Sequence, residues 1–214
     1  MSAVRFQKID DQNRQDHYYL TAEDECLFLY EYTSGMGYAH SETNSLILNL
    51  KKKKNSNGYV WKGRAIASCA AALGPAFNPK WLADAVLVPI PPSKIKTDPL
   101  YDDRMTQVCR AIQSSVPIDV RELIEQINST AAVHDGERLK PEEIEANYRI
   151  DESQCSAGSP KYIGIVDDML TAGAHFRAAK NTLSKRFPTS KITGIFIARR
   201  VFSEPEISLD DLLS

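Results

Sequence analysis

Three short runs of aliphatic residues set the pattern of this chain. They cover residues 85–90, 163–166 and 192–198, and segments with helical spacing separate them. A continuous apolar run rich in branched side chains is typical of a strand covered on both faces of a parallel sheet. We therefore expect an α/β fold, with a parallel sheet flanked by helices and joined by right-handed crossovers.

Helices and shorter strands are expected between these runs. Ser41 or Thr43 could cap a helix that ends at Leu50, although the apolar run 46–48 also permits a strand. The other predicted elements are a strand over 26–32, helices over 60–72, 100–114, 141–146 and 173–187, and a short strand over 116–120.

Apolar residues recur at helical spacing in two of these helices and predict their buried faces. The first helix, over 60–72, is expected to stop at the Gly-Pro pair 74–75. Its predicted buried stripe is Val60, Trp61, Ala65, Cys69 and Ala72. The predicted inner face of the second, over 100–114, is Met105, Val108, Cys109 and Ile112.

Length and composition fit one domain. The chain has 214 residues and a formal net charge of −2, and we expect residues 1–24 to be an N-terminal extension and 203–214 a surface tail. The polar N-terminus argues against a signal peptide, and no apolar run is long enough to span a bilayer.

The four cysteines lie far apart, as expected of reduced thiols in a cytoplasmic protein. Lys51–Lys54 reads as a solvated loop or as a nucleic-acid patch.

The candidate chemistry follows the apolar run 163–166. Asp167 and Asp168 come directly after it, at the strand end where α/β sheets bind ligands. The small residues 171–174 let backbone N–H groups approach an anion, and the helix after them would direct its positive N-terminus to the same place. Two carboxylates beside such a cradle predict a ligand with hydroxyls and a phosphate, such as a ribose 5-phosphate.

Two further polar segments belong to the predicted site. The loop 91–96 follows the apolar run 85–90, so it faces the same crevice if the two strands are neighbours. The polar stretch 129–149 is expected to form a flap. No G-x-G-x-x-G or G-x-x-x-x-G-K-[ST] motif is present, which disfavours a dinucleotide-binding oxidoreductase and a kinase-type phosphate loop.

Residues Ile163–His175 resemble the phosphoribosyl pyrophosphate motif of type I phosphoribosyltransferases. Asp167 and Asp168 match its acid pair, Thr171 its first hydroxyl and Gly173 its glycine. His175 departs from the pattern, which has Thr or Ser there.

A second stretch resembles ComF-type homologues of these enzymes. The run 88–92, the lysines at 94 and 96, Asp103-Arg104 and the segment 138–147 are similar to corresponding parts of that group. Members often begin with a cysteine zinc ribbon, which this chain lacks.

The resemblance implies a role for each part of the site. Asp167 and Asp168 would bind the ribose hydroxyls and, through ribose or water, Mg²⁺. The loop after the first apolar run would carry a strained peptide that faces the pyrophosphate. The implied 5-phosphate site is Thr171, Ala172, Gly173, Ala174 and His175, and the implied pyrophosphate site is Pro92, Ser93, Lys94 and Lys96. The implied catalytic residues are Asp167, Asp168, Lys94 and Arg104.

Plainer interpretations stand beside these. Lys94 and Lys96 could be surface lysines, Arg104 could pair with Asp102 or Asp103, and His175 could lie on a helix surface. Two functions remain open: transfer or hydrolysis at the ribose anomeric carbon, or a non-catalytic nucleotide-binding module in a DNA-handling or regulatory assembly. The implied partners are phosphoribosyl pyrophosphate or a nucleotide, a second copy of the chain, and a DNA-handling protein.

Overall fold

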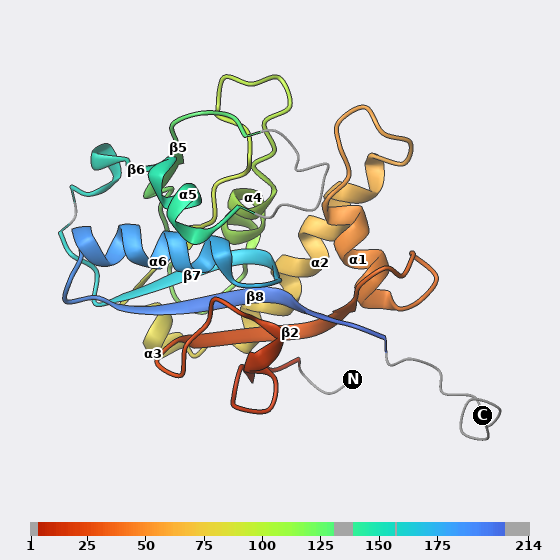
Figure 1. Ribbon diagram of the computed structural model, residues 1–214, viewed down its shortest axis with the longest axis horizontal. Helices are drawn as coiled ribbons and strands as arrows, with labels where there is room; N and C mark the ends of the chain where they lie inside the picture. Colours follow the sequence, from red (N-terminus) through yellow and green to blue (C-terminus); the bar gives the residue numbers. More distant parts are fainter. Residues whose placement is uncertain (1–3, 131–138, 157, 204–214) are drawn as a thin grey trace.

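A six-stranded sheet forms the centre of the protein. The structure, a computed structural model, describes residues 4–130, 139–156 and 158–203. The strand order is β1-β2-β8-β7-β3-β4, in which β1 pairs antiparallel and all other neighbours are parallel (Figure 1). The strands are β1 (Gln7–Lys8), β2 (Glu25–Thr33), β3 (Ala85–Pro89), β4 (Asp119–Val120), β7 (Tyr162–Leu170) and β8 (Lys191–Val201). The α/β fold is thereby confirmed, and it is compatible with a type I phosphoribosyltransferase-like sheet.

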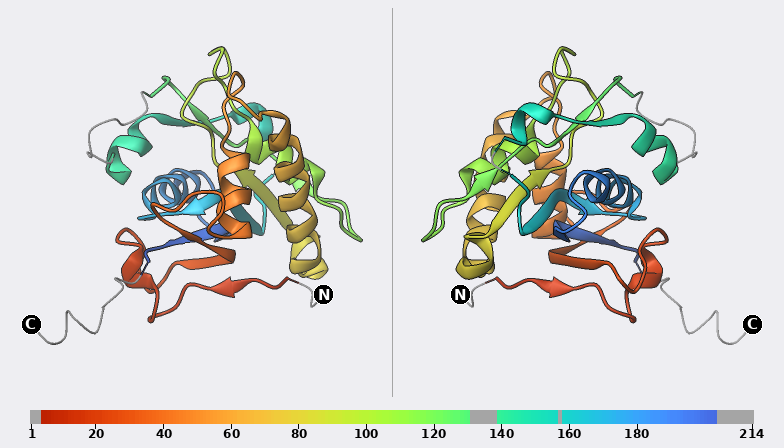
Figure 2. Two further views of the ribbon diagram at one scale, coloured as in Figure 1. Left: turned by 90° about the vertical axis from the view of Figure 1, so that its right-hand side faces the viewer. Right: turned by 90° about the vertical axis from the view of Figure 1, so that its left-hand side faces the viewer.

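Helices cover both faces of this sheet. On one face lie α1 (Glu42–Leu50), α2 (Val60–Ala76) and α4 (Arg104–Ala111); on the other lies α6 (Ala174–Arg186), with α5 (Pro141–Ala146) packed on it (Figure 2). The remaining elements are α3 (Pro79–Leu82), the antiparallel pair β5 (Ile124–Gln126) and β6 (Tyr148–Ile150), and the 3₁₀ helices Arg14–Asp16 and Glu152–Gln154. Each face has its own apolar core, one around Phe176 and Leu183 and one around Leu73 and Val108.

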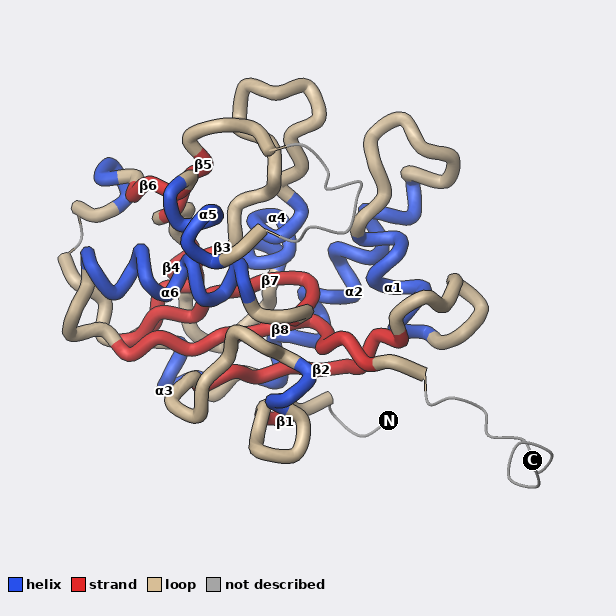
Figure 3. Tube along the Cα trace, in the orientation of Figure 1, coloured by secondary structure: helices blue, strands red, loops and turns tan. Residues whose placement is uncertain are grey.

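The strands β3 and β7 are neighbours, as the shared crevice requires. They pair in parallel from Ala85 opposite Tyr162 to Pro89 opposite Val166, and the N–H of Ile90 donates to the carbonyl of Val166. Their carboxyl ends therefore lie at the same edge of the sheet, and the loop after β3 starts beside the acid pair of β7. The loops 51–59 and 91–103 project on the same side of the molecule (Figure 3).

The first turn of α1 explains why this segment forms a helix rather than a strand. The Oγ of Ser41 accepts a hydrogen bond from the backbone N–H of Asn44 at 3.0 Å, the expected N-cap interaction. Asn44 is itself buried and bonds the backbone of Thr33 through both ends of its amide. The strand alternative over 46–48 is wrong, because this cap fixes a helix that packs against the end of β2.

Two predicted helix boundaries are wrong. The helix α2 continues through the Gly-Pro pair 74–75, because a proline in the last turn removes only one intrahelical hydrogen bond. A glycine is needed there for a different reason: a Cβ on Gly74 would lie 2.4 Å from the carbonyl oxygen of Gln113. The helix α4 begins at Arg104 rather than at Leu100, after a turn in which the N–H of Leu100 donates to Asp98.

The buried face of α2 differs in part from its prediction. Ala65 and Cys69 are buried, whereas Val60 and Trp61 are 73% and 47% exposed. Because these two residues belong to the first turn, they project beyond the sheet that the rest of the helix covers. The inner face of α4 is confirmed, since Met105, Val108, Cys109 and Ile112 are all buried.

The strands β7 and β8 are longer than the apolar runs that predict them. Asp167 and Asp168 lie inside β7 rather than after it, and Arg199 and Arg200 lie inside β8. Pairing between the two strands continues to Leu170 opposite Arg199, so the main-chain ladder keeps these polar residues in strand conformation.

The N-terminal segment packs on the body of the protein. Its first strand pairs with β2, and residues 14–24 then lie against the turn between β7 and α6.

Residues 204–214, most of the predicted tail, are outside the described residues. All four cysteines are buried and free. Among the described helices, none has the length and apolar character to span a bilayer.

Candidate functional site

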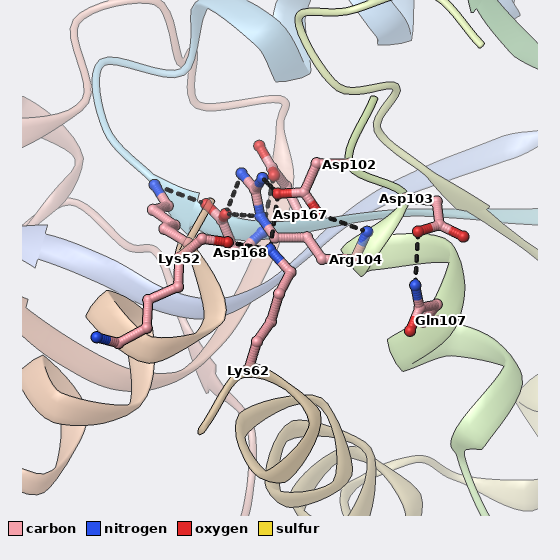
Figure 4. A network of polar contacts seen from close by, with 9 residues as sticks. Lys52, Lys62, Asp102, Asp103, Arg104, Gln107, Asp167 and Asp168 are labelled. Carbon is pink, nitrogen blue, oxygen red and sulfur yellow. Dashed lines mark hydrogen bonds and ion pairs between the residues drawn. The ribbon is translucent and has the colours of Figure 1, made fainter. Parts of the chain in front are cut away.

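The buried carboxylate of Asp168 is the centre of the predicted site. Asp168 is 3% exposed and lies near the carboxyl end of β7. Its Oδ1 atom is 3.0 Å from Nζ of Lys51. Its Oδ2 atom is 2.7 Å from Nη2 and 2.8 Å from Nε of Arg104 (Figure 4). Each carboxylate oxygen therefore has a cation of its own, one from the end of α1 and one from the start of α4.

Arg104 also joins this centre to a second acid. Its Nη1 atom lies 2.7 Å from Oδ2 of Asp102, and the same oxygen is 2.8 Å from Nζ of Lys62. Lys62 is 4% exposed, and its ammonium group also donates to the carbonyl of Lys52. Asp102 is thus one partner of Arg104, as the plainer interpretation expected, but Asp168 is another. The result is a continuous network of alternating charges from α1 to α2, in the order Lys51, Asp168, Arg104, Asp102 and Lys62.

The two adjacent acids differ in their environment. Asp167 is only partly buried; its Oδ1 accepts the N–H of Asp168 at 2.7 Å, and among the described residues nothing bonds its Oδ2. Burial, and then the neighbouring charge of Asp168, raise the pKa of Asp167. Burial also acts to raise the pKa of Asp168, but Lys51 and Arg104 outweigh it and hold that pKa below its ordinary value. Asp168 is therefore a fixed anion, and Asp167 is the carboxylate with an oxygen left for a ligand.

The turn after β7 has the shape of an anion cradle. Gly173 has φ +87°, in the left-handed region that favours glycine, and it precedes α6 with no side chain that caps the helix. The first N–H groups of α6 are thus left for another acceptor. A Cβ on Gly173 would lie 3.0 Å from Cδ2 of Leu20 in the N-terminal segment. Thr171, Ala172 and Ala174 are each partly exposed beside it.

His175 occupies the first turn of α6 and is exposed. Its Nδ1 atom lies 3.1 Å from the hydroxyl of Tyr148 in β6. His175 is thus beside the cradle, with one of its two nitrogens already in a hydrogen bond.

The loop 91–96 follows β3, as predicted, but the partners of its lysines are in the flap segment for Lys94 and at or next to β5 for Lys96, rather than in the acid pair. Nζ of Lys94 donates to the carbonyl of Thr130, and Nζ of Lys96 lies 3.0 Å from a carboxylate oxygen of both Glu122 and Glu125. Of the other loop residues implied in pyrophosphate binding, Pro92 accepts a hydrogen bond from Gln126, and the exposed Ser93 accepts one from the N–H of Thr130.

This loop and β5 enclose a cleft of about 270 Å³, lined among others by Pro92, Lys94, Lys96 and Arg149. Every peptide bond in the described residues is trans, and only glycines there have positive φ. The strained peptide that the resemblance implies is therefore not a feature of the loop.

The base of the predicted flap is well defined. Ser129 donates to Asp98 and accepts from the N–H of Ile95, so the segment is fixed to the loop after β3. Residues 131–138, which include His134 and Arg138, lie outside the described residues. The later part of the flap forms α5 and β6, and α5 packs on α6.

Two kinds of residue at this site are not predicted by any local pattern in the sequence. The lysine tract 51–54 predicts a solvated loop or a nucleic-acid patch, and no pattern marks Lys62, yet Lys51 and Lys62 both belong to the charge network. No local signal separates them from other lysines, because their partners are far away in the chain. Nor does any local pattern mark His17, which is fully buried beside Thr171.

The donor set of this site suits Mg²⁺ only with help from a ligand. No group of three or more His, Cys, Asp or Glu side chains lies close enough to hold a metal within the described residues. Both oxygens of Asp168 are in ion pairs, which leaves Asp167 as the available carboxylate. Mg²⁺ commonly binds through one or two carboxylates, waters and substrate phosphates, so Asp167 fits a metal carried in by a phosphorylated ligand.

Comparison with known proteins does not identify the chain. No family model matches the sequence, and no curated protein matches it.

Proposed function

We propose that this protein is a member of the type I phosphoribosyltransferase superfamily. It binds phosphoribosyl pyrophosphate or a nucleotide together with Mg²⁺, and it transfers or hydrolyses at the anomeric carbon of the ribose. The observation that carries the proposal is the arrangement at the end of β7. A partly exposed carboxylate, Asp167, lies near the carboxyl end of β7, and a short turn then leads to a left-handed glycine and an uncapped helix N-terminus.

The charge distribution supports this proposal. Asp167 offers an acceptor for ribose hydroxyls, while the backbone N–H groups of residues 172–174 offer donors to a 5-phosphate. Lys51 and Arg104 keep Asp168 ionised, and the fixed Asp168 carboxylate holds both cations beside the acid pair. When bound, Mg²⁺ would neutralise charge on the departing pyrophosphate. The proposed role of Asp167 is to hold that ion and the ribose.

Titration calorimetry with phosphoribosyl pyrophosphate and Mg²⁺ tests this proposal. The wild type should bind, and Asp167→Asn should bind at least about tenfold more weakly, because an amide cannot supply the anionic oxygen. Asp103→Asn is a matched control: Asp103 is the neighbour of Arg104 in the chain, but it accepts a hydrogen bond from Gln107 and does not contact the acid pair (Figure 4). Absence of heat with the wild type, or equal affinity of wild type and Asp167→Asn, would contradict the proposal.

The second candidate is a non-catalytic nucleotide-binding module that acts on nucleic acid. The surface around the loop 51–59 favours it, and we name this the basic loop surface. Lys53 and Lys54 are exposed there, and Arg64 stacks over the ring of Trp61, itself 47% exposed. Lysines and exposed aromatic rings are the features that bind the phosphates and bases of single strands.

Two measurements separate the candidates. Release of pyrophosphate from phosphoribosyl pyrophosphate in the presence of nucleobases would support the enzyme; a ligand that binds without reaction would support the module. The module also requires that a fluorescent single-stranded oligonucleotide bind with strong salt dependence. That binding should weaken in Lys53→Gln/Lys54→Gln and remain in the matched control Lys185→Gln, which changes an exposed lysine of α6.

A further inference from the structure

The segment 14–24 contacts every residue of the turn 171–173, and we name it the N-terminal strap. The ring of His17 bonds the carbonyl of Thr171, and the N–H of Tyr19 donates to the carbonyl of Ala172 at 2.8 Å. Leu20 lies against Gly173. All three contacts act on the backbone that would hold a 5-phosphate. The strap therefore forms the outer support of the cradle rather than a separate extension.

Ion pairs hold both ends of the strap in place. At its start, Asp16 lies 3.1 Å from Nη1 of Arg199 in β8. At its end, the fully buried carboxylate of Asp24 pairs with Arg177 and, at 2.7 Å, with Lys180, both on α6. Arg177 also donates to the carbonyl of Tyr19. The strap is thus fixed to the strand beside β7 and to the helix whose N-terminus faces the site.

His17 is the central contact of the strap. It is 0% exposed, and its Nδ1 atom faces the carbonyl oxygen of Thr171, which can only accept a hydrogen bond. Nδ1 therefore carries the proton. Among the described residues Nε2 has no hydrogen-bond partner and is buried, which fits a neutral ring with an unprotonated Nε2. The orientation of His17 is consequently set by one interaction, and that interaction acts on the cradle.

We propose that His17 is a positioning residue of the phosphate cradle. Its Nδ1–H holds the carbonyl of Thr171 on the strap side, so that the N–H groups of residues 172–174 stay directed toward a bound phosphate. A peptide plane is rigid, and fixing a carbonyl therefore fixes the N–H of the next residue. The inference rests on the proposed function, because the positioning acts on a ligand only if this turn binds one.

The test uses three variants of His17 and one control variant, all in the full chain. His17→Leu keeps an apolar side chain in the buried site but removes the donor, and His17→Ala repeats the removal in case the leucine variant does not fold. His17→Asn places an amide N–H close to the position of Nδ1 and should restore the contact. Tyr18→Ala is the control, because Tyr18 belongs to the strap but is 82% exposed.

Amide hydrogen exchange of the segment 171–176 is the first measurement. Exchange should accelerate in His17→Leu and His17→Ala, and stay at the wild-type rate in His17→Asn and Tyr18→Ala. Unchanged exchange in the variants without a donor, or acceleration in His17→Asn equal to theirs, would overturn the inference. This measurement needs no ligand, so it decides the role of His17 in the turn even if the wild type binds no phosphoribosyl pyrophosphate and the proposed function fails.

Ligand affinity is the second measurement. Affinity for ribose 5-phosphate should fall about tenfold in His17→Leu, because a small displacement of positioning groups has effects of that size or larger. Affinity for Mg²⁺-pyrophosphate, which lacks the 5-phosphate, should stay at the wild-type value, and His17→Asn should recover binding of ribose 5-phosphate. Equal losses for both ligands would indicate a general structural effect and would overturn the positioning role.

Discussion

Nζ of Lys51 lies 3.0 Å from Oδ1 of Asp168, and this contact joins the end of α1 to the end of β7. Asp168 is buried, so removal of one cation leaves part of its charge uncompensated. We expect Lys51→Ala to lower the free energy of unfolding by about 2 kcal/mol. Urea denaturation measures the change.

The control for Lys51 is its exposed neighbour Lys53. Lys53→Ala should change the free energy of unfolding by no more than about 0.5 kcal/mol, as is usual for a surface position. If both lysine variants have the same small effect, Lys51 does not contribute to the stability of the buried carboxylate.

Arg104 bridges two carboxylates, which a lysine cannot do. Its three guanidinium nitrogens contact Asp168 and Asp102, whereas a lysine has one ammonium group that can reach only one of them well. Arg104→Met should lower the free energy of unfolding by about 3 kcal/mol, and Arg104→Lys should recover only part of that loss. The comparison is Arg110→Lys on the same helix, where the side chain is 64% exposed and stability should not change.

Gly164 lies inside β7, where three side chains leave no space for a methyl group. A Cβ at this position would lie 2.7 Å from Cδ1 of Ile195 and 3.0 Å from both Leu87 and Trp81. Gly164→Ala should therefore lower the free energy of unfolding by about 1–3 kcal/mol. Ile195→Val removes the nearest atom, so the double variant should be more stable than Gly164→Ala alone. Thermal or urea unfolding of the four proteins of this cycle provides the check.

His17 makes stability depend on pH. Burial lowers the pKa of His17 below its ordinary value of 6.5, although the bond to Thr171 opposes this; among the nearby charges Arg199 and Arg200 favour the lowering and Asp16 opposes it. The unfolded chain therefore binds the proton more readily, and the stability contributed by neutral His17 is complete above about pH 6.5 and decreases as the pH falls below it.

The comparison for this pH dependence is His17→Asn, which has no titrating ring. As the pH falls from 7.5 to 5.5, the free energy of unfolding of the wild type should decrease relative to that of His17→Asn. The change should reach about 1.4 kcal/mol for each unit by which the pKa is lowered, once the pH lies below the folded-state pKa. A difference that is constant over this range would contradict the assignment of a buried neutral His17.

The main elements of the fold follow from local patterns in the sequence. The apolar run 163–166 needs burial on both faces, and the acids and small residues after it define a turn and a helix start that the structure contains. Ser41 as an N-cap and Pro141 at a helix start act within a few residues, so their helices were predicted close to their actual bounds. These features depend on backbone geometry and on short-range hydrogen bonds, both of which are visible in sequence.

The charge network and the support of the cradle depend on contacts between distant segments. In sequence Lys51 is one of four consecutive lysines, and it differs from the others only because the end of α1 lies beside Asp168. Lys96, for which the resemblance implies pyrophosphate binding, pairs with Glu122 and Glu125 because β5 lies beside its loop, and no local pattern predicts these partners.

The N-terminal segment shows most clearly the difference between what local sequence patterns predict and what contacts between distant segments decide. Its polar sequence predicts a loose or short-helical extension, yet packing places His17 against the turn that follows β7. The sequence by itself determined the longer strands, most of the helices and the acid pair, because each is encoded within a few neighbouring residues. Only the tertiary structure decided which cations neutralise Asp168 and which segment supports the cradle, because electrostatic and hydrogen-bond partners are selected by distance in space rather than along the chain.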